Sequence, residues 1–333
     1  MAKGKTLKLF TGNANPQLAE RIAKYVGQPL GAVSVSRFPD GEVYVKYEED
    51  VRGCHVALIQ PTNQPEVNLK ELKLMAYAAR SSSAACVTAV IPYFGYGRQD
   101  RKDQPRVGIT ARLVADELVE AGVQHILALD LHAAQIQGFF DPKRCIVEYL
   151  YGKPVFISLF QHLGLTDVMN GPPDLGRAKT AESYAQRLGG GIYFAVKVRQ
   201  PGGHAERVTI IGDVQGKKTR IIDDEISTGR TMALAADALH AAGAVSIDIV
   251  ASHGKFVDEA AERLAASSVS TYFVGDSVVL PQRARELLGS HLRQVTFAPL
   301  LGEAIKHLHH DESLSVLFQD DYVGTLYKGS YFL

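Results

Sequence analysis

The chain has 333 residues, of which 46% are hydrophobic and 22% charged, an ordinary globular composition that excludes a disordered or collagen-like chain. Lys and Arg number 36, as do Asp and Glu, so the formal net charge is zero. This balance argues against a protein that holds nucleic acid or a membrane through bulk positive charge. We therefore expect neither partner.

The length also bears on domain organisation, because one hydrophobic core rarely grows to the size of this chain, and two domains are expected. The longest apolar runs, such as residues 87–92, are too short to cross a bilayer. The first residues lead directly into a strand-like run rather than the apolar core of a signal peptide. Cys54, Cys86 and Cys145 are odd in number and lack metal-ligand spacing, which argues against zinc and disulfides. The sequence predicts a soluble, cytoplasmic protein.

Strand-like and helix-like segments alternate along nearly the whole chain. The predicted strands, many of them rich in Val and Ile, are residues 7–11, 55–61, 87–93, 126–131, 154–158, 209–212, 219–223, 246–252, 271–274 and 295–298. The predicted amphipathic helices include residues 68–80, 110–121, 180–188 and 231–242. Gly122 and Gly243 fall just past two of these helices, where a left-handed stop residue is favoured. The alternation predicts an α/β fold with doubly wound parallel sheets.

A weak internal similarity, an internal echo, indicates two similar halves. The segment ACVTAVIPYFG at residues 85–95 resembles AVSIDIVASHG at residues 244–254. Duplication and convergent βαβ patterning explain this echo equally well. The alternation breaks at residues 145–154, and the last part of the chain shows no clear period. We therefore expect domains at 1–150 and 151–308, followed by an unassigned tail at 309–333.

The strongest functional signal is the segment 219–231, TRIIDDEISTGRT, which leads into a predicted helix. Ligands of open α/β sheets bind beyond the carboxyl ends of the strands, which is where Asp223 and Asp224 lie. The turn that follows offers backbone N–H groups, hydroxyls and the positive end of a helix dipole, all of which suit a phosphate. Carboxylates suit sugar hydroxyls or Mg²⁺, so the combination favours a phosphorylated sugar. Helix capping by Ser227 or Thr228, with solvated carboxylates, is the alternative.

This segment resembles the phosphoribosyl-diphosphate-binding loop that phosphoribosyltransferases and ribose-phosphate pyrophosphokinases share. Three further segments are similar to pyrophosphokinase signatures: RFPDGE at 37–42, AVIPYFGYGRQDRKD at 89–103 and LDLHAAQIQGFFD at 129–141. The matches run in order from about Phe38 to His253. The resemblance to the ribose-phosphate pyrophosphokinase family implies two similar domains of the type I phosphoribosyltransferase fold, the first on the ATP side and the second binding ribose 5-phosphate.

The resemblance implies that two segments hold ATP. The ring of residue 38 would stack on adenine. Nearby carboxylates would accept a hydrogen bond from the exocyclic amine of adenine, partly across a subunit contact. Taken alone, residues 38–41 are a turn. The basic run 98–102 would supply cations for the triphosphate, with a solvated charged face as the alternative. The implied ATP-binding residues are Phe38, Asp40, Gly41, Glu42, Arg98 and Gln99.

The resemblance also implies the metal ligands and the catalytic residues. His132 and Asp174 would ligate Mg²⁺, whereas from the residues alone they are a structural histidine and a helix N-cap. Lys197 and Arg199, in AVKVRQPGGH at 195–204, match the catalytic lysine and the substrate-binding arginine, ahead of a segment expected to close over ATP. An edge strand with solvated basic residues is the alternative. The implied ribose 5-phosphate-binding residues are Arg199, Asp223, Asp224, Ser227, Thr228, Gly229, Arg230 and Thr231.

The implied reaction moves the diphosphoryl group of Mg-ATP to the 1-hydroxyl of ribose 5-phosphate, for nucleotide biosynthesis, in a dimer-based or hexameric homo-oligomer. Two alternatives are a weakly active regulatory relative of the synthetase and a phosphoribosyltransferase. The retained His132, Asp174 and Lys197 argue against the first, and the ATP-side segments disfavour the second. Ser227 and Arg230 depart from the common bacterial loop, as Val198 and Arg177 depart from neighbouring segments, which leaves oligomeric state and regulation open.

Overall fold

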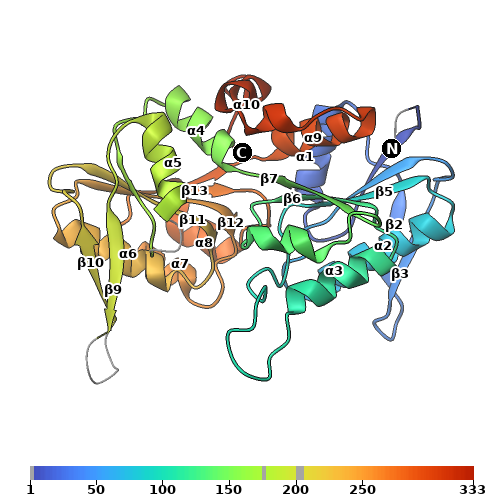
Figure 1. The fold of residues 1–333 in the computed structure, drawn as a ribbon, viewed down its shortest axis with the longest axis horizontal. Coiled ribbons are helices and arrows are strands. Elements are labelled where there is room, and N and C mark those ends of the chain that lie inside the picture. Colours follow the sequence, from blue (N-terminus) through green and yellow to red (C-terminus); the bar gives the residue numbers. More distant parts are fainter. Residues whose placement is uncertain (1–3, 175–177, 200–205) are drawn as a thin grey trace. The chain divides into compact units, whose positions relative to one another are not determined.

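The computed structural model describes residues 4–174, 178–199 and 206–333, without the side chains of residues 198, 199, 206 and 207. The chain forms two compact units (Figure 1). The first consists of Met1–Gly152 with Phe297–Leu326, and the second of Lys153–Thr296 with Tyr327–Leu333. Each unit is built on a sheet of five parallel strands, which confirms the predicted α/β class. No described helix has the length and apolar character that crossing a membrane requires.

The first unit has the strand order β1-β4-β5-β6-β7. These strands are β1 (Leu7–Thr11), β4 (His55–Ile59), β5 (Cys86–Ile91), β6 (His125–Leu129) and β7 (Ile146–Leu150). The helices are α1 (Pro16–Val26), α2 (Val67–Ser81), α3 (Thr110–Glu120), the 3-10 helix η1 (Ala134–Phe139), α9 (Ala298–His310), the 3-10 helix η4 (Ser315–Phe318) and most of α10 (Asp320–Tyr327). An antiparallel hairpin of β2 (Val33–Arg37) and β3 (Val43–Tyr47) stands apart from the sheet.

Both faces of this sheet are covered by other elements. Successive side chains of a strand point to opposite faces, so neighbouring residues of β4 show what covers each face. Val56 and Leu58 share an apolar cluster with Leu72 of α2 and Val114 of α3. His55 is on the other face, where its Nδ1 lies 3.1 Å from Nδ1 of His309 in α9. Burial lowers the pKa of His55 to about 3, so its imidazole is neutral at neutral pH, and burial also lowers the pKa of His309. Two-sided burial explains the continuous apolar runs of β4 and β5.

The second unit has the strand order β14-β13-β12-β11-β8. These strands are β8 (Met169–Gly171), β11 (Lys218–Ile226), β12 (Ser246–Gly254), β13 (Thr271–Gly275) and β14 (Leu292–Val295). The helices are α4 (Lys153–His162), α5 (Ala178–Leu188), α6 (Arg230–Ala241), α7 (Ala260–Ala265), α8 (Gln282–Leu288) and the 3-10 helix η3 (Gly289–His291). β9 (Phe194–Arg199) and β10 (Glu206–Ile211) form a separate antiparallel ribbon.

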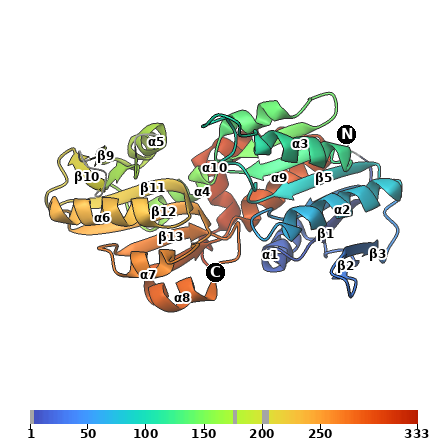
Figure 2. The ribbon, with the colours of Figure 1, turned by 90° about the horizontal axis from the view of Figure 1, so that it is seen from below.

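Strand β11 is held on both faces, which matters because it ends at the predicted phosphate loop. Ile221 packs in the apolar cluster formed with α6, α7 and α8, which lie along one face of the sheet (Figure 2). Arg220 is fully buried, and its guanidinium lies 3.7 Å from the ring centroid of Phe160 in α4. It donates to the carbonyl oxygen of Leu165 over 3.1 Å. Burial lowers the pKa of Arg220 to about 10, which leaves it charged at neutral pH.

Two predicted strands are wrong. Residues 154–158 lie in α4, a helix buried from Pro154 to Phe160, so its apolar run carries no helical period. Residues 295–298 span the end of β14 and the first residue of α9 rather than a strand. The four predicted helices are confirmed within two residues at each end, and Gly122 and Gly243 have the expected positive φ of 99° and 90°. The internal echo falls on β5 and β12, the middle strand of each sheet.

The predicted domain limits at 150 and 308 remain predictions. The contact units show, however, that the chain returns to the first unit at Phe297. The reason is local packing, because α9 lies against α1, and Tyr25 of α1 donates to Glu303 of α9 over 3.1 Å. Tyr322, in the predicted tail, donates to the same carboxylate over 3.1 Å. Part of the tail that the sequence left unassigned is therefore structural.

Candidate active site

The hairpin β2–β3 presents the first predicted nucleotide segment at its tip. The N–H of Phe38 donates to the carbonyl of Glu42 over 2.8 Å, and the N–H of Gly41 donates back to Phe38 over 2.9 Å. Gly41 has a φ of 93°, so the predicted turn is confirmed. The ring of Phe38 is 48% exposed, 5.1 Å from the ring of Tyr44. The tip thus carries an exposed aromatic face beside the carboxylates of Asp40 and Glu42.

Polar side chains fasten this hairpin to the body of the first unit. Asn13 follows β1, and its Nδ2 donates to the carbonyl of Val35 over 3.1 Å and to Glu71 over 3.0 Å. Glu71 of α2 is buried and also accepts from Gln60 over 3.0 Å. The sequence interpretation missed Asn13, although it lies two residues after the carboxyl end of the predicted strand 7–11. The rule that flagged Asp223 and Asp224 would have found it.

The second predicted nucleotide segment follows β5. Gln99 donates from its N–H to Tyr96 over 2.9 Å, and its side chain accepts from the hydroxyl of Thr110 over 2.5 Å. These bonds place Gln99 against the first turn of α3. The side chains of Arg98, Arg101 and Lys102 are exposed, so the basic run forms a charged surface next to the carboxyl end of β5.

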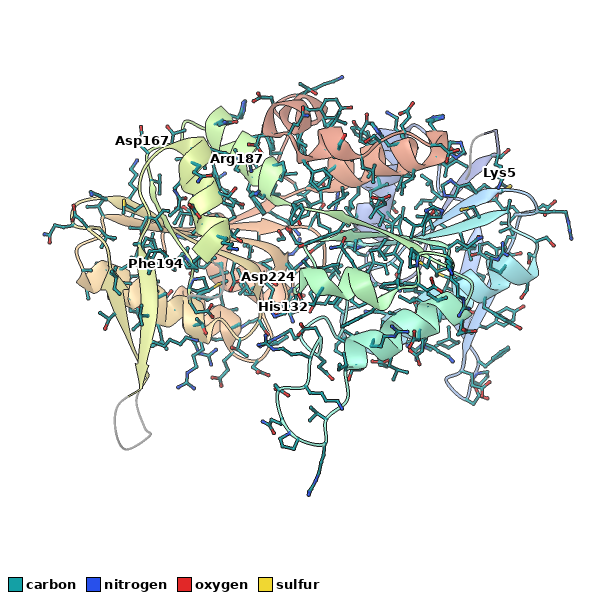
Figure 3. All side chains as sticks on the ribbon, in the orientation of Figure 1. Lys5, His132, Asp167, Arg187, Phe194 and Asp224 are labelled. Carbon is teal, nitrogen blue, oxygen red and sulfur yellow. The ribbon has the colours of Figure 1, made fainter. Side chains whose placement is uncertain are left out.

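His132 lies beside this basic segment, just past the end of β6 (Figure 3). A Cβ placed on Gly97 would be 3.5 Å from the Cβ of His132, which shows how closely the two loops approach. A second contact joins the same loops, because the amide of Gln135 donates to the carboxylate of Asp100. The structure therefore brings the Arg98 and His132 segments together at one edge of the first sheet, as their positions after neighbouring parallel strands predict.

The predicted phosphate loop of the second unit joins β11 to α6. Gly229 is the N-cap of α6, with a φ of 68°, and its carbonyl accepts from Ala233 over 2.9 Å. In this described stretch, no side chain caps the helix, so the alternative in which Ser227 or Thr228 serves as a cap is wrong. The hydroxyls before the helix are left for another role. The geometry matches a left-handed turn that exposes backbone N–H groups at a helix N-terminus.

The two carboxylates that precede this loop differ in burial. Asp224 is 7% exposed, whereas Asp223 is half-buried. The N–H of Asp224 donates to Oδ1 of Asp223 over 2.9 Å, which fixes that side chain against its own strand. Two carboxylates thus stand in fixed positions at the entrance to the loop.

Lys197 also reaches this loop. It lies on β9, and its Nζ donates to the hydroxyl of Thr231 over 3.2 Å. The strand alternative for this segment is therefore correct for the backbone, but the lysine still contacts the loop. The side chain of Arg199 and residues 200–205 lie outside the described part of the chain. Asp174 is half-buried just past β8, and residues 175–177 after it are likewise outside.

Comparison with known proteins covers nearly the whole chain. A model of the N-terminal domain of ribose phosphate pyrophosphokinase matches residues 7–122, and a phosphoribosyl synthetase-associated domain matches residues 194–319. A ribose-phosphate pyrophosphokinase of Wolinella succinogenes is 41% identical over 93% of this chain and 98% of its own length. One of Chlorobaculum tepidum is 42% identical over 94% and 95%.

A solved structure agrees with these relatives. The crystal structure of phosphoribosylpyrophosphate synthetase from Mycobacterium smegmatis superposes with a TM-score of 0.83 at 35% identity. It covers 92% of this chain and 100% of its own. The similarity therefore extends over both units rather than over the phosphate loop alone.

Proposed function

The chain belongs to the ribose-phosphate pyrophosphokinase family, and from this premise we propose that it transfers the diphosphoryl group of ATP to the 1-hydroxyl of ribose 5-phosphate. The products are phosphoribosyl diphosphate and AMP. The observation that carries the proposal is the match to such enzymes over 93% of the chain. A phosphoribosyltransferase would account for the loop in the second unit but not for the matched N-terminal domain.

Ribose 5-phosphate is the substrate of the second unit. The loop at residues 227–231 takes the 5-phosphate, because N–H groups and the positive end of α6 favour an anion. Arg230, at the first position of α6, adds a full positive charge. Asp223 and Asp224 accept hydrogen bonds from the ribose hydroxyls.

ATP is the substrate of the first unit. Adenine stacks on the exposed ring of Phe38, and its exocyclic amine donates to Asp40 or Glu42. The backbone at Gly41 allows the turn that brings these side chains to one tip. Arg98 and Gln99 bind the phosphates near the carboxyl end of β5, where the basic run is exposed.

The transfer itself is an in-line displacement. The 1-hydroxyl oxygen attacks the β-phosphorus, the bond from that phosphorus to the oxygen shared with the α-phosphate breaks, and AMP leaves with the bonding electron pair. The hydroxyl proton passes to solvent. Lys197, with Arg199, neutralises charge on the diphosphoryl group as it moves, and removal of one such donor typically costs about 3 kcal/mol of transition-state stabilisation.

Mg²⁺ is the proposed cofactor, and the residues fit it in a particular way. Within the described ranges, no three His, Cys, Asp or Glu side chains form a ready-made metal cage. Mg²⁺ usually binds through one or two protein ligands together with substrate phosphates, so such a cage is not required. His132 and Asp174 would supply those ligands. When bound, the ion offsets charge on the triphosphate.

The test is an assay of AMP release by the pure full-length chain. We expect AMP only when ATP, ribose 5-phosphate and Mg²⁺ are all present. A phosphoribosyltransferase would instead consume phosphoribosyl diphosphate and a nucleobase without releasing AMP. A regulatory relative would bind both substrates and release no AMP. Either result would overturn the proposal. Light scattering on the same sample tests the proposed dimer-based or hexameric homo-oligomer.

A further inference from the structure

Hydrogen bonds connect the backbone at the start of the loop at residues 227–231 to the segment that follows β12. The carbonyl of Ile226 accepts from the N–H groups of Lys255 and Phe256 over 2.9 and 3.1 Å. The carbonyl of Ser227 accepts from the N–H of Val257 over 3.1 Å. The carbonyl of Thr228 accepts from the guanidinium of Arg263 in α7. The three successive carbonyl groups of residues 226–228 thus point toward the segment 255–263.

This arrangement determines where the N–H groups of the loop point. In a trans peptide unit, the carbonyl of one residue and the N–H of the next lie in one plane and point in opposite directions. The N–H groups of Ser227, Thr228 and Gly229 therefore point away from the segment 255–263. Three N–H groups on one side of a turn form a concave site for an anion. The hydrogen-bond donors that hold the carbonyls of residues 226–228 therefore also set the direction of the N–H groups of residues 227–229.

The three carbonyl anchors are not equivalent. The first two are backbone N–H groups, which nearly any residue at those positions would supply. An ion pair with a buried carboxylate reinforces them, because Lys255 Nζ lies 3.0 Å from Glu225, the residue before Ile226. The third anchor is a side chain, that of Arg263. Arg263 holds the peptide unit between Thr228 and Gly229. The N–H of this unit belongs to Gly229, the N-cap of α6, and lies at the positive end of the helix dipole.

The neighbourhood of Arg263 keeps its side chain at the loop. Leu264, the next residue of α7, lies directly under Gly229, because a Cβ placed there would be 3.0 Å from its side chain. Glu259, one turn earlier, lies 3.9 Å from the guanidinium of Arg263. The backbone of α7 therefore sits against the loop, and the arginine reaches back to the carbonyl of Thr228 from a short distance.

We propose that Arg263 is a positioning residue for ribose 5-phosphate. It orients the peptide unit between Thr228 and Gly229 so that the N–H of Gly229 faces the 5-phosphate. The inference rests on the proposed function of this loop, but it concerns a residue outside the loop. Arg263 acts on the substrate through this peptide unit.

The experiment compares three substitutions of Arg263 in the full chain. Arg263→Met removes the donors and keeps much of the length, Arg263→Gln keeps a neutral donor, and Arg263→Lys keeps a charged donor. The control is Arg283→Met, because Arg283 also pairs with α7, through Glu262 at 2.8 Å, but does not contact the loop. Calorimetry gives the dissociation constant of ribose 5-phosphate, and steady-state assays give both KM values and kcat.

We expect Arg263→Met to weaken ribose 5-phosphate binding about tenfold, because a charge-assisted hydrogen bond that orients a ligand-binding group is lost. Arg263→Lys should recover most of this loss and Arg263→Gln part of it. KM for ATP and the midpoint of thermal unfolding should stay at the values of wild type and Arg283→Met. Unchanged affinity in Arg263→Met would overturn the inference, as would a parallel loss in ATP affinity and unfolding temperature.

This outcome can be separated from failure of the proposed function. If the wild-type chain neither binds ribose 5-phosphate nor releases AMP, the proposed function fails. If the wild type does both and Arg263→Met and Arg263→Gln bind ribose 5-phosphate as tightly, only the role of Arg263 fails.

Discussion

The two candidate substrate regions are built in opposite ways. In the second unit, the backbone carbonyls of residues 226–228 accept hydrogen bonds from the segment 255–263, and Asp224 is 7% exposed. In the first unit, the candidate groups are exposed side chains: Phe38 is 48% exposed, and Arg98 and His132 are exposed as well. On the proposed assignment, the loop in the second unit is formed before ribose 5-phosphate binds. ATP would have to order exposed side chains in the first unit, at about 0.5–1.5 kcal/mol for each long one. Changes to the backbone of the loop in the second unit, or to the groups that anchor it, should weaken binding of ribose 5-phosphate. Truncation of the exposed side chains in the first unit should weaken binding of ATP.

The largest expected effect comes from the side chain that joins the ribbon β9–β10 to the phosphate loop. Lys197→Ala should lower kcat about 100- to 1,000-fold, because a cation that offsets charge in the transition state is removed. KM for ribose 5-phosphate should change far less. The AMP assay measures both, and Lys217→Ala, in an exposed pair with Asp213, is the control. Full activity of Lys197→Ala would exclude this lysine from catalysis.

A second prediction concerns the stability of the anchored region. Lys255→Met removes one ion pair of the buried carboxylate of Glu225 and should lower the free energy of unfolding by about 3 kcal/mol. The double variant Glu225→Met with Lys255→Met should recover most of that loss, because both charges are gone. Urea unfolding of the full chain measures the difference. A double variant as unstable as the single one would show that loss of the lysine charge beside Glu225 is not the cause.

A third prediction separates backbone strain from the phosphate site. Gly229 and Gly216 have nearly the same φ, 68° and 69°. A Cβ added to Gly216 would have no other atom within 4 Å, apart from its chain neighbours. Gly216→Ala should cost about 1–2 kcal/mol of stability, because an L-residue resists the left-handed conformation. Gly229→Ala should cost more, because its Cβ would also lie 3.0 Å from the side chain of Leu264. We expect Gly229→Ala alone to lose ribose 5-phosphate affinity, as measured by calorimetry. Equal loss of affinity in both variants would contradict the preformed-site account.

The smallest expected effect is on the nucleotide side. Phe38→Ala should raise KM for ATP about fivefold, which corresponds to loss of one stacking contact of about 1 kcal/mol. KM for ribose 5-phosphate should not change. Tyr77→Ala, which removes a 63% exposed ring from α2, is the matched control. A loss of ribose 5-phosphate affinity in Phe38→Ala would break the division between the two regions.

Sequence patterns predicted the fold class and the carboxyl ends of strands because periodicity is a local signal. They failed where that signal is ambiguous. Residues 154–158 are apolar throughout because α4 is buried on all sides, and a short apolar run does not distinguish a strand from a buried helix. The start of α9 was missed although Pro299 lies in its first turn, a position that favours a helix start.

The candidate site was predictable only in part. Its phosphate loop could be found because strand, turn and helix follow one another within residues 219–231. The contact between Lys197 and Thr231, and the anchors from Lys255 and Arg263, join segments 25 or more residues apart. Such contacts depend on tertiary packing, which periodicity and spacing do not encode. The assigned roles of the site residues remain predictions.

The proposed diphosphoryl transfer by the full chain is tested most directly by ³¹P NMR of one reaction mixture. With the full chain, ATP, ribose 5-phosphate and Mg²⁺, we predict equal amounts of AMP and of a diphosphate attached to C1 of the ribose, with the bond between the β- and γ-phosphates intact. Formation of ADP with a singly phosphorylated C1, or no change in the ATP signals, would contradict the account.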